Sequence, residues 1–279
     1  MNMEFRTLQQ TPLEELSVVF NQAFQNYFVE IALTPEQLAG KFAADGVRLD
    51  LSVGAFYREK LVGFIFHGTN EQAENRVAYN GGTGVIPEYR GQQLTIKMYE
   101  FILLILKQEE VKKIRLEAIT ENIRAIKSYT DLGFSIIRKV DCFRGNFKTK
   151  ETSHEIILQQ QIDEETAQQL WEVTPTWQNS FLSVRRQAKA VQCLIVKKEN
   201  QVAGYLLLHT KNGRVMQFAV HPQWRNNGIA SALFQKAAQL KETLAIINLD
   251  SKSEITTSFL KKHGFNYTLS QYEMELELL

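Results

Sequence analysis

The chain has 279 residues, a length that accommodates two domains of ordinary size. Its 44% hydrophobic, 10% aromatic and 23% charged residues are typical of a folded protein and exclude the disordered and collagen-like classes. The net charge of +1, the two cysteines and the lack of a membrane-length apolar run favour a cytoplasmic protein without a disulfide framework, bound neither to nucleic acid nor to a membrane.

Two apolar segments at 51–57 and 61–67 flank a short polar turn and predict a β-hairpin. The strand that follows ends in N-G-G-T-G-V at 80–85. Gly81, Gly82 and Gly84 suit a bulged strand that another group approaches closely. An irregular edge strand is the alternative interpretation of these glycines.

A sharp turn comes next, because Pro87 fixes one backbone dihedral and a long helix begins near Gly91. The first amides of a helix have no partner inside it, so together with the helix dipole they can bind a phosphate or pyrophosphate. Arg90 can add a charge-assisted contact, and Gly91 lets the backbone approach a ligand closely. The alternative is an ordinary strand-to-helix connection with a surface arginine.

Farther along, a strand carries Glu117, and the segment N-I-R-A-I-K-S-Y at 122–129 predicts a second helix. Asn122 suits the N-cap of this helix, and Tyr129 suits its inner face. Gly133 follows the helix end, where glycine supplies the left-handed backbone conformation that ends helices.

The same order of elements recurs about 135 residues later. A second hairpin pattern lies at 191–197 and 202–209. The segment at 220–232, V-H-P-Q-W-R-N-N-G-I-A-S-A, aligns with the segment at 85–97, V-I-P-E-Y-R-G-Q-Q-L-T-I-K. The tripeptide at 263–265, H-G-F, aligns with L-G-F at 132–134. The two aligned helices each carry an apolar face of helical period, at Leu94, Met98, Ile102 and Ile105 in the first copy and at Ile229, Leu233, Ala237 and Leu240 in the second.

Two copies of one unit therefore make up the chain, and the alternation of strands with helices predicts a mixed α/β sheet in each. The polar stretch at 148–153 marks the boundary, which gives an N-terminal domain at 1–150 and a C-terminal domain at 151–279. Because this stretch is too short for a flexible linker, we expect the copies to pack together, as a pseudo-dimer within a monomer.

The repeated motifs resemble those of the GNAT superfamily of N-acetyltransferases. The segment R-N-N-G-I-A at 225–230 fits the signature R-x-x-G-x-A/G, with which that superfamily grips the pyrophosphate of coenzyme A. The segment R-G-Q-Q-L-T at 90–95 fits it less closely, since Gln93 replaces glycine and Thr95 replaces glycine or alanine. Residues 122–134 resemble the second signature, N-x-x-A-x-x-x-Y-x-x-x-G-F. The resemblance covers both copies and implies two tandem acyl-CoA N-acyltransferase folds.

For the first copy the resemblance implies an acetyl-CoA site. The backbone of Thr83, Gly84 and Val85 would bind the pantetheine arm and the acetyl carbonyl, and Asn122 would hydrogen-bond the arm. Tyr129 would protonate the departing thiolate, since a phenol with a pKa of ~10 keeps its proton at neutral pH. The pyrophosphate would lie at the turn made by Arg90, Gly91, Gln92, Gln93, Leu94 and Thr95.

The second copy departs from the pattern where the chemistry is expected. Ser253 stands in place of the asparagine, and Leu260, which cannot donate a proton, stands in place of the tyrosine. We therefore expect catalysis in the first copy. The second copy would then be a non-catalytic cofactor pocket, a structural partner or a lid over the acceptor site.

The activity that these features favour is direct acetyl transfer from acetyl-CoA to a small-molecule or peptide amine, without a metal ion. Glu117 and, less directly, Glu30 are candidates for the base that takes the amine proton, although either also fits a solvated or ion-paired carboxylate. Two alternatives are a binding module that senses acetyl-CoA without turnover and a scaffold that has lost cofactor binding in both copies.

Overall fold

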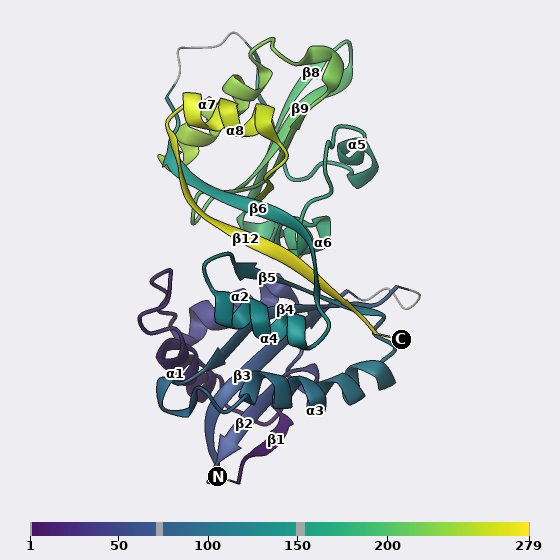
Figure 1. Ribbon diagram of the computed structural model, residues 1–279. Helices are drawn as coiled ribbons and strands as arrows, with labels where there is room; N and C mark the ends of the chain where they lie inside the picture. Colours follow the sequence, from purple (N-terminus) through teal and green to yellow (C-terminus); the bar gives the residue numbers. More distant parts are fainter. Residues whose placement is uncertain (1, 71–74, 149–153, 279) are drawn as a thin grey trace. The chain divides into compact units, whose positions relative to one another are not determined.

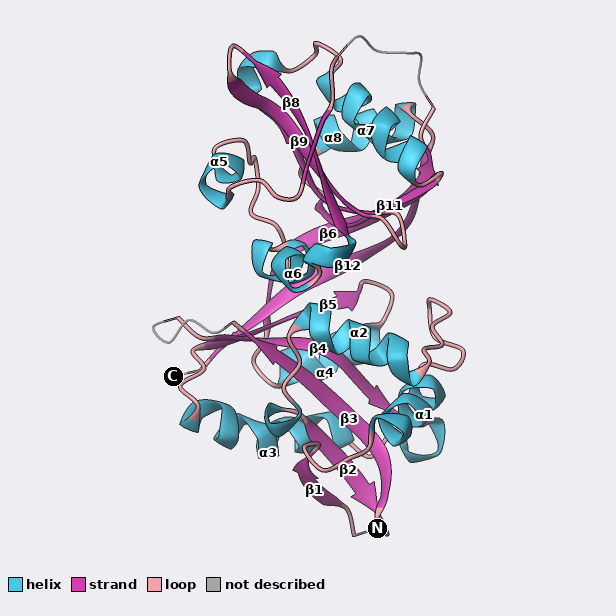
Figure 2. Ribbon diagram, turned by 180° about the vertical axis from the view of Figure 1, so that it is seen from behind, coloured by secondary structure: helices cyan, strands magenta, loops and turns pink. Residues whose placement is uncertain are grey.

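The computed structural model describes residues 2–70, 75–148 and 154–278. The chain divides into two compact units, of which the first comprises Met1–Ile137 with Tyr272–Leu279 and the second Arg138–Gln271. Each unit is a mixed α/β structure with helices on both faces of its strands (Figures 1 and 2). Among the described residues, no helix is long and apolar enough to cross a membrane.

The division between the units differs from the boundary expected near residue 150. It falls inside strand β6 (Ser135–Asn146), and strand β12 (Phe265–Glu277) is divided as well, so that the end of β12 belongs to the first unit. The polar stretch at 148–153 lies, apart from Lys148, outside the described residues. No glycine or proline marks either point of division, so local sequence carries no signal for it.

The first unit has the strand order β1-β2-β3-β4-β5-β12-β6. Its strands β1 (Glu4–Thr7), β2 (Val53–Tyr57), β3 (Lys60–Thr69) and β4 (Val77–Val85) are antiparallel neighbours, and β5 (Lys113–Ile119) runs parallel to β4. Four helices complete this unit: α1 (Leu13–Ala23), α2 (Pro35–Asp45), α3 (Leu94–Gln108) and α4 (Ile123–Asp131).

The alternation of side chains along the strands gives this unit two cores. Phe64 and Phe66 of β3 pack with Phe20 of α1 on one face, whereas Ile65 between them packs with Met98 of α3 on the other. Helices α1 and α2 therefore cover one face of the sheet, and α3 and α4 cover the opposite face.

The second unit repeats this arrangement with the strand order β12-β6-β11-β10-β9-β8-β7. Its further strands are β7 (Ile157–Gln159), β8 (Val191–Lys198), β9 (Gln201–His209), β10 (Arg214–Val220) and β11 (Thr243–Asp250). Helices α7 (Ile229–Leu240) and α8 (Glu254–Lys262) share one core, and α5 (Glu164–Gln168) and α6 (Phe181–Arg186) share the other.

Both predicted hairpins are confirmed as β2–β3 and β8–β9. Their two-residue turns have positive φ at both positions, 47° and 66° at Arg58 and Glu59 and 50° and 63° at Glu199 and Asn200. This is the turn whose twist matches that of the flanking strands. The sequence repeat therefore corresponds to a repeat of local geometry.

The predicted apolar helix faces are confirmed except near the helix ends. Leu94, Met98 and Ile102 of α3 are buried, and Ile105 is partly buried. In α7 the last expected core position, Leu240, is 41% exposed, because the helix ends at this residue.

The end of β12 completes the core of the first unit. Met274 is fully buried, and Leu278 donates its backbone N–H to the carbonyl of Lys112 at 2.7 Å. Glu275 forms ion pairs with Arg115 at 2.6 Å and Lys113 at 3.3 Å across the β5–β12 pair. The first unit thus depends on a segment that lies more than a hundred residues away along the chain.

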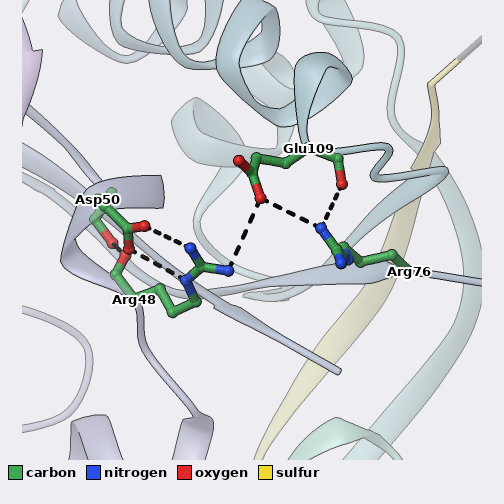
Figure 3. A network of polar contacts seen from close by, with 5 residues as sticks. Arg48, Asp50, Arg76 and Glu109 are labelled. Carbon is green, nitrogen blue, oxygen red and sulfur yellow. Dashed lines mark hydrogen bonds and ion pairs between the residues drawn. The ribbon is translucent and has the colours of Figure 1, made fainter. Parts of the chain in front are cut away.

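A polar network joins the end of α3 to the start of β4 (Figure 3). Arg76 donates to the backbone carbonyl of Glu109 at 2.7 Å and to its carboxylate at 3.3 Å, while Arg48 contacts Glu109 at 3.9 Å and Asp50 at 2.5 Å. A cation at a helix C-terminus satisfies free carbonyls and complements the helix dipole. The network therefore secures α3, the helix that follows the predicted phosphate-binding turn.

Candidate active site

Strands β4 and β5 separate where the site is expected. Their parallel pairing runs from Val77–Lys113 to Tyr79–Arg115, although β4 continues to Val85 and β5 to Ile119. Backbone groups on the facing edges of a separated pair are available to a ligand. The predicted residues Thr83, Gly84 and Val85 all lie on β4 beyond this point of separation.

The bulge expected from the glycines is present at Gly81. Phe66 and His67 of β3 pair with Gly82 and Asn80, which leaves Gly81 as the extra residue. Gly84 has a different requirement, because a Cβ there would lie 2.6 Å from the ring of Phe64. Packing inside the unit thus explains this glycine without a ligand.

The predicted phosphate-binding turn has two residues in the left-handed conformation. These are Gly91, with φ of 79°, and Gln93, with φ of 55°, directly before α3 begins at Leu94. Gln92 lies between them, and Thr95 is in the first turn of the helix. The glutamine at position 93 therefore adopts the conformation for which glycine is best suited, and the shape of the turn is kept.

Arg90 has a structural role in addition to the one expected. Its guanidinium donates to the carbonyl of Val85 at 3.1 Å and to that of Ala23, the last residue of α1, at 3.0 Å. It ties the end of β4 to α1 and so shapes the turn. A direct contact between Arg90 and a phosphate stays a prediction.

Replacing Gln93 with glycine should raise the free energy of unfolding by up to about 1 kcal/mol, because a non-glycine residue in this conformation is strained. The matched substitution Gln92→Gly should lower it by about 0.5–1 kcal/mol, since no positive φ at that position favours glycine. Denaturant unfolding of both variants measures the difference. Equal effects of the two substitutions would contradict the strain at Gln93.

Tyr129 lies beside the separated strand. It is 7% exposed and packs in the core with Tyr99 and Phe134, and the side chains of Thr83 and Asn80 of β4 partly oppose the effect of burial on its pKa. Burial is the main cause that raises the pKa of Tyr129 to about 12. The hydroxyl is thus protonated at neutral pH and next to β4, as a proton donor requires.

Asn122 is confirmed as the N-cap of α4. Its carbonyl oxygen accepts from the backbone N–H of Ala125 at 3.2 Å, and its amide donates to the hydroxyl of Tyr27 at 3.1 Å. An amide group carries two N–H donors, so one of them is compatible with a further acceptor. Both roles considered for Asn122 therefore remain compatible.

Glu117 projects to the face opposite Tyr129. Its neighbour Leu116 is buried in the core against α3 and α4, and successive strand side chains alternate, so Glu117 lies on the face that α1 and α2 cover. The hydroxyl of Tyr79 donates to its Oε2 at 2.6 Å. Burial raises the pKa of Glu117 to about 7, against the opposing effect of the Tyr79 hydrogen bond.

Comparisons with known protein families identify both units. Residues 15–134 match the acetyltransferase (GNAT) family, and residues 189–267 match an acetyltransferase (GNAT) domain. The chain is a tandem member of the GNAT superfamily. A comparison with curated proteins found no matching sequence.

Solved GNAT structures resemble this tandem protein over nearly its whole length. A putative acetyltransferase from Pyrococcus horikoshii covers 99% of this chain and 89% of its own, with a TM-score of 0.73 at 16% identity. A GCN5-related N-acetyltransferase from Sphaerobacter thermophilus has a TM-score of 0.73 at 12% identity, covering 99% and 96%. A tandem GNAT protein from the clavulanic acid biosynthesis pathway has a TM-score of 0.72 at 11% identity, covering 100% and 99%. At these identities the likeness establishes the shared fold.

The second GNAT unit has the same backbone features. Strands β10 and β11 pair only at Arg214–Ala245 and Val215–Ile246, and Met216 is the bulged residue. In the turn, Asn226 and Gly228 have φ of 61° and 79°. A pocket of about 840 Å³ opens here, lined by residues of both strands and of the turn. A non-catalytic cofactor pocket is one of the three roles that the sequence suggested for this copy, and this pocket is compatible with it.

The side chains of the second unit differ from those of the first at the positions predicted to transfer protons. Leu260 is fully buried in the core. Ser253 is at the N-cap of α8 without a capping hydrogen bond from its side chain. Glu117 precedes the N-cap Asn122 by the same number of residues as Asn248 precedes the N-cap Ser253. Asn248 therefore stands where the first unit has Glu117, and an amide cannot act as a base.

Two residues of the turn in the second unit also form polar contacts with side chains outside the turn. Arg225 pairs with the carboxylate of Glu172, and His154 contacts the carbonyl of Asn227 at 2.5 Å. A carboxylate beside the turn opposes the binding of a phosphate. The two turns thus have like backbones and different surroundings.

Proposed function

We propose that the protein is an N-acetyltransferase that moves an acetyl group from acetyl-CoA to a small-molecule or peptide amine, with the chemistry in the first unit. The observation that carries the proposal is that a carboxylate, Glu117, and a phenol, Tyr129, lie on opposite faces of the sheet where β4 and β5 separate. Glu117 approaches from the side of α1 and α2, and Tyr129 from the side of α3 and α4.

In the proposed reaction the amine nitrogen attacks the thioester carbonyl, so that a C–N bond forms and the C–S bond breaks. Glu117 takes the proton that leaves nitrogen, and Tyr129 gives a proton to the departing sulfur. Backbone amides of β4 would stabilise the charge that develops on the carbonyl oxygen. Thr83, Gly84, Val85 and Asn122 would hold the pantetheine arm, and the amides of residues 91–95 the pyrophosphate.

A pKa of about 7 suits Glu117 to the role of base. A base with a pKa near the working pH is ionised in a large fraction of molecules and still accepts a proton readily. Glu30, the other candidate, is exposed, and no described hydrogen bond or ion pair holds its side chain. The geometry therefore favours Glu117.

A second candidate function is a binding site in the second unit that holds acetyl-CoA without turnover. The observation in its favour is the pocket of about 840 Å³ at the bulged strand and turn, combined with Asn248 and Leu260 at the proton-transfer positions. One chain can have both functions, with catalysis in the first unit and binding without turnover in the second.

Replacing Tyr129 with phenylalanine should lower the rate of acetyl transfer about a hundredfold, because the proton donor is lost while the ring that packs in the core is kept. The measurement is thiol release from acetyl-CoA over a panel of amines. The control is Tyr267→Phe, which removes the hydroxyl of a half-exposed tyrosine in the second unit. Full activity of Tyr129→Phe would contradict the assignment, and acetyl-CoA binding without thiol release by the natural protein would favour the sensor.

A further inference from the structure

The two carboxylate oxygens of Glu117 are held differently. Oε2 accepts the hydroxyl hydrogen of Tyr79 at 2.6 Å, whereas Oε1 is shielded from solvent and has no hydrogen-bond partner among the described residues. A buried polar atom without a partner costs free energy, so each such atom in a native protein requires an explanation. For Oε1 the explanation would be that this oxygen has to receive a proton.

Tyr79 is fixed from both sides of its strand. It pairs with Gly68 of β3 and with Arg115 of β5, and it is the last residue of β4 in the parallel ladder before the two strands separate. The side chain is 3% exposed. The sheet therefore sets the position of the hydroxyl, and a single O–H donor serves only one of the two carboxylate oxygens.

We propose that Tyr79 is a positioning residue for the base, holding Oε2 so that Oε1 is the oxygen that receives the amine proton. This inference rests on the proposed function, in which Glu117 is the base. The Tyr79 hydroxyl would also favour the ionised form of the Glu117 carboxylate, which burial disfavours.

The charged groups that face Glu117 come from two elements, β12 and α2. Glu273 of β12 and Asp45 of α2 oppose ionisation of Glu117, and Lys41 of α2 favours it. The Nζ of Lys41 lies 2.5 Å from Asp45 Oδ2, so the charge of the lysine is largely matched by its own partner. Tyr79, from β4, is thus the neutral group that favours the carboxylate by direct hydrogen bonding, and its removal should raise the pKa of Glu117.

The test follows the titration of Glu117 without any substrate. Full-length protein with ¹³C-labelled glutamate carboxyls is titrated by NMR, and the resonance that is missing in Glu117→Gln is assigned to Glu117. In the natural protein this resonance should titrate near pH 7. In Tyr79→Phe it should titrate higher by roughly one pH unit, since the charged form has lost one hydrogen bond.

The matched control is Tyr205→Phe. Tyr205 is fully buried, and its hydroxyl donates to Gln217 in the second unit at 2.9 Å. The control loses this hydrogen bond and one that the hydroxyl accepts from Trp171 at 2.7 Å, and it should leave the Glu117 titration unchanged. An unchanged titration in folded Tyr79→Phe would overturn the role of Tyr79. If Glu117 in the natural protein titrates near 4.5, its ordinary pKa, this result would instead overturn the choice of Glu117 as the base.

Discussion

Removal of residues 272–279 should unfold the first unit and leave the second unit folded. The deleted segment supplies buried Met274 and Leu278 to the core around α3, and Glu275 to the ion pairs with β5. Its loss would expose the edge of β5 and open the core. Deletion of a single buried large side chain costs about 2–5 kcal/mol, and whole domains are stable by only about 5–15 kcal/mol.

Hydrogen exchange measured by mass spectrometry tests this expectation region by region. In the truncated protein, β2–β5 should lose protection, whereas β8–β11 should keep it. Met274→Ala in the full chain should lower the stability of the first unit by about 2–5 kcal/mol. Glu277→Ala, on the same strand but exposed, should change it by less than about 1 kcal/mol. Protection of β2–β5 that survives truncation would contradict the place of β12 in this core.

Replacing Glu117 with glutamine should lower kcat/KM about a thousandfold and remove the dependence of the rate on pH near 7. Glu117 must be ionised to accept a proton, so in the natural protein kcat/KM should rise with pH through about 7 and then level off. Glutamine has nearly the same shape and cannot accept the proton. The measurement is the pH–rate profile of thiol release, once the amine panel has provided an acceptor.

Loss of folding would not explain such an effect. Because folding raises the pKa of Glu117 from 4.5 to about 7, the folded state binds the proton more tightly than the unfolded state, and the ionised group lowers stability as pH rises through this range. Glu117→Gln should therefore be at least as stable as the natural protein at pH 8. An active variant with an unaltered pH profile would exclude Glu117 as the base.

Much of the fold could be predicted because it depends on local patterns. The hairpins follow from apolar runs around two-residue turns, and the helix faces follow from residues such as Met98 and Leu233 at helical spacing. The repeat also fixed which segments are equivalent. The division of β6 and β12 between the units could not be predicted, because it depends on pairing between distant strands.

The site was predicted in part, for a similar reason. Tyr129 and Asn122 were predicted because they belong to a spaced motif, and their roles toward acetyl-CoA stay predictions. Tyr79 was missed because nothing near it in the sequence indicates its contact with Glu117, which lies 38 residues away. For the second copy the sequence left three roles open, a cofactor pocket among them, because the substitutions at Ser253 and Leu260 change side chains and not the backbone features of the turn.

The most direct test of the account is a crystal structure of the full chain with acetyl-CoA. We expect the cofactor between β4 and β5, with its pyrophosphate on the amides of residues 91–95 and its thioester between Glu117 and Tyr129. A second molecule in the pocket of the other unit would agree with this account. Acetyl-CoA bound in the second unit alone would contradict it and move the chemistry away from Glu117 and Tyr129.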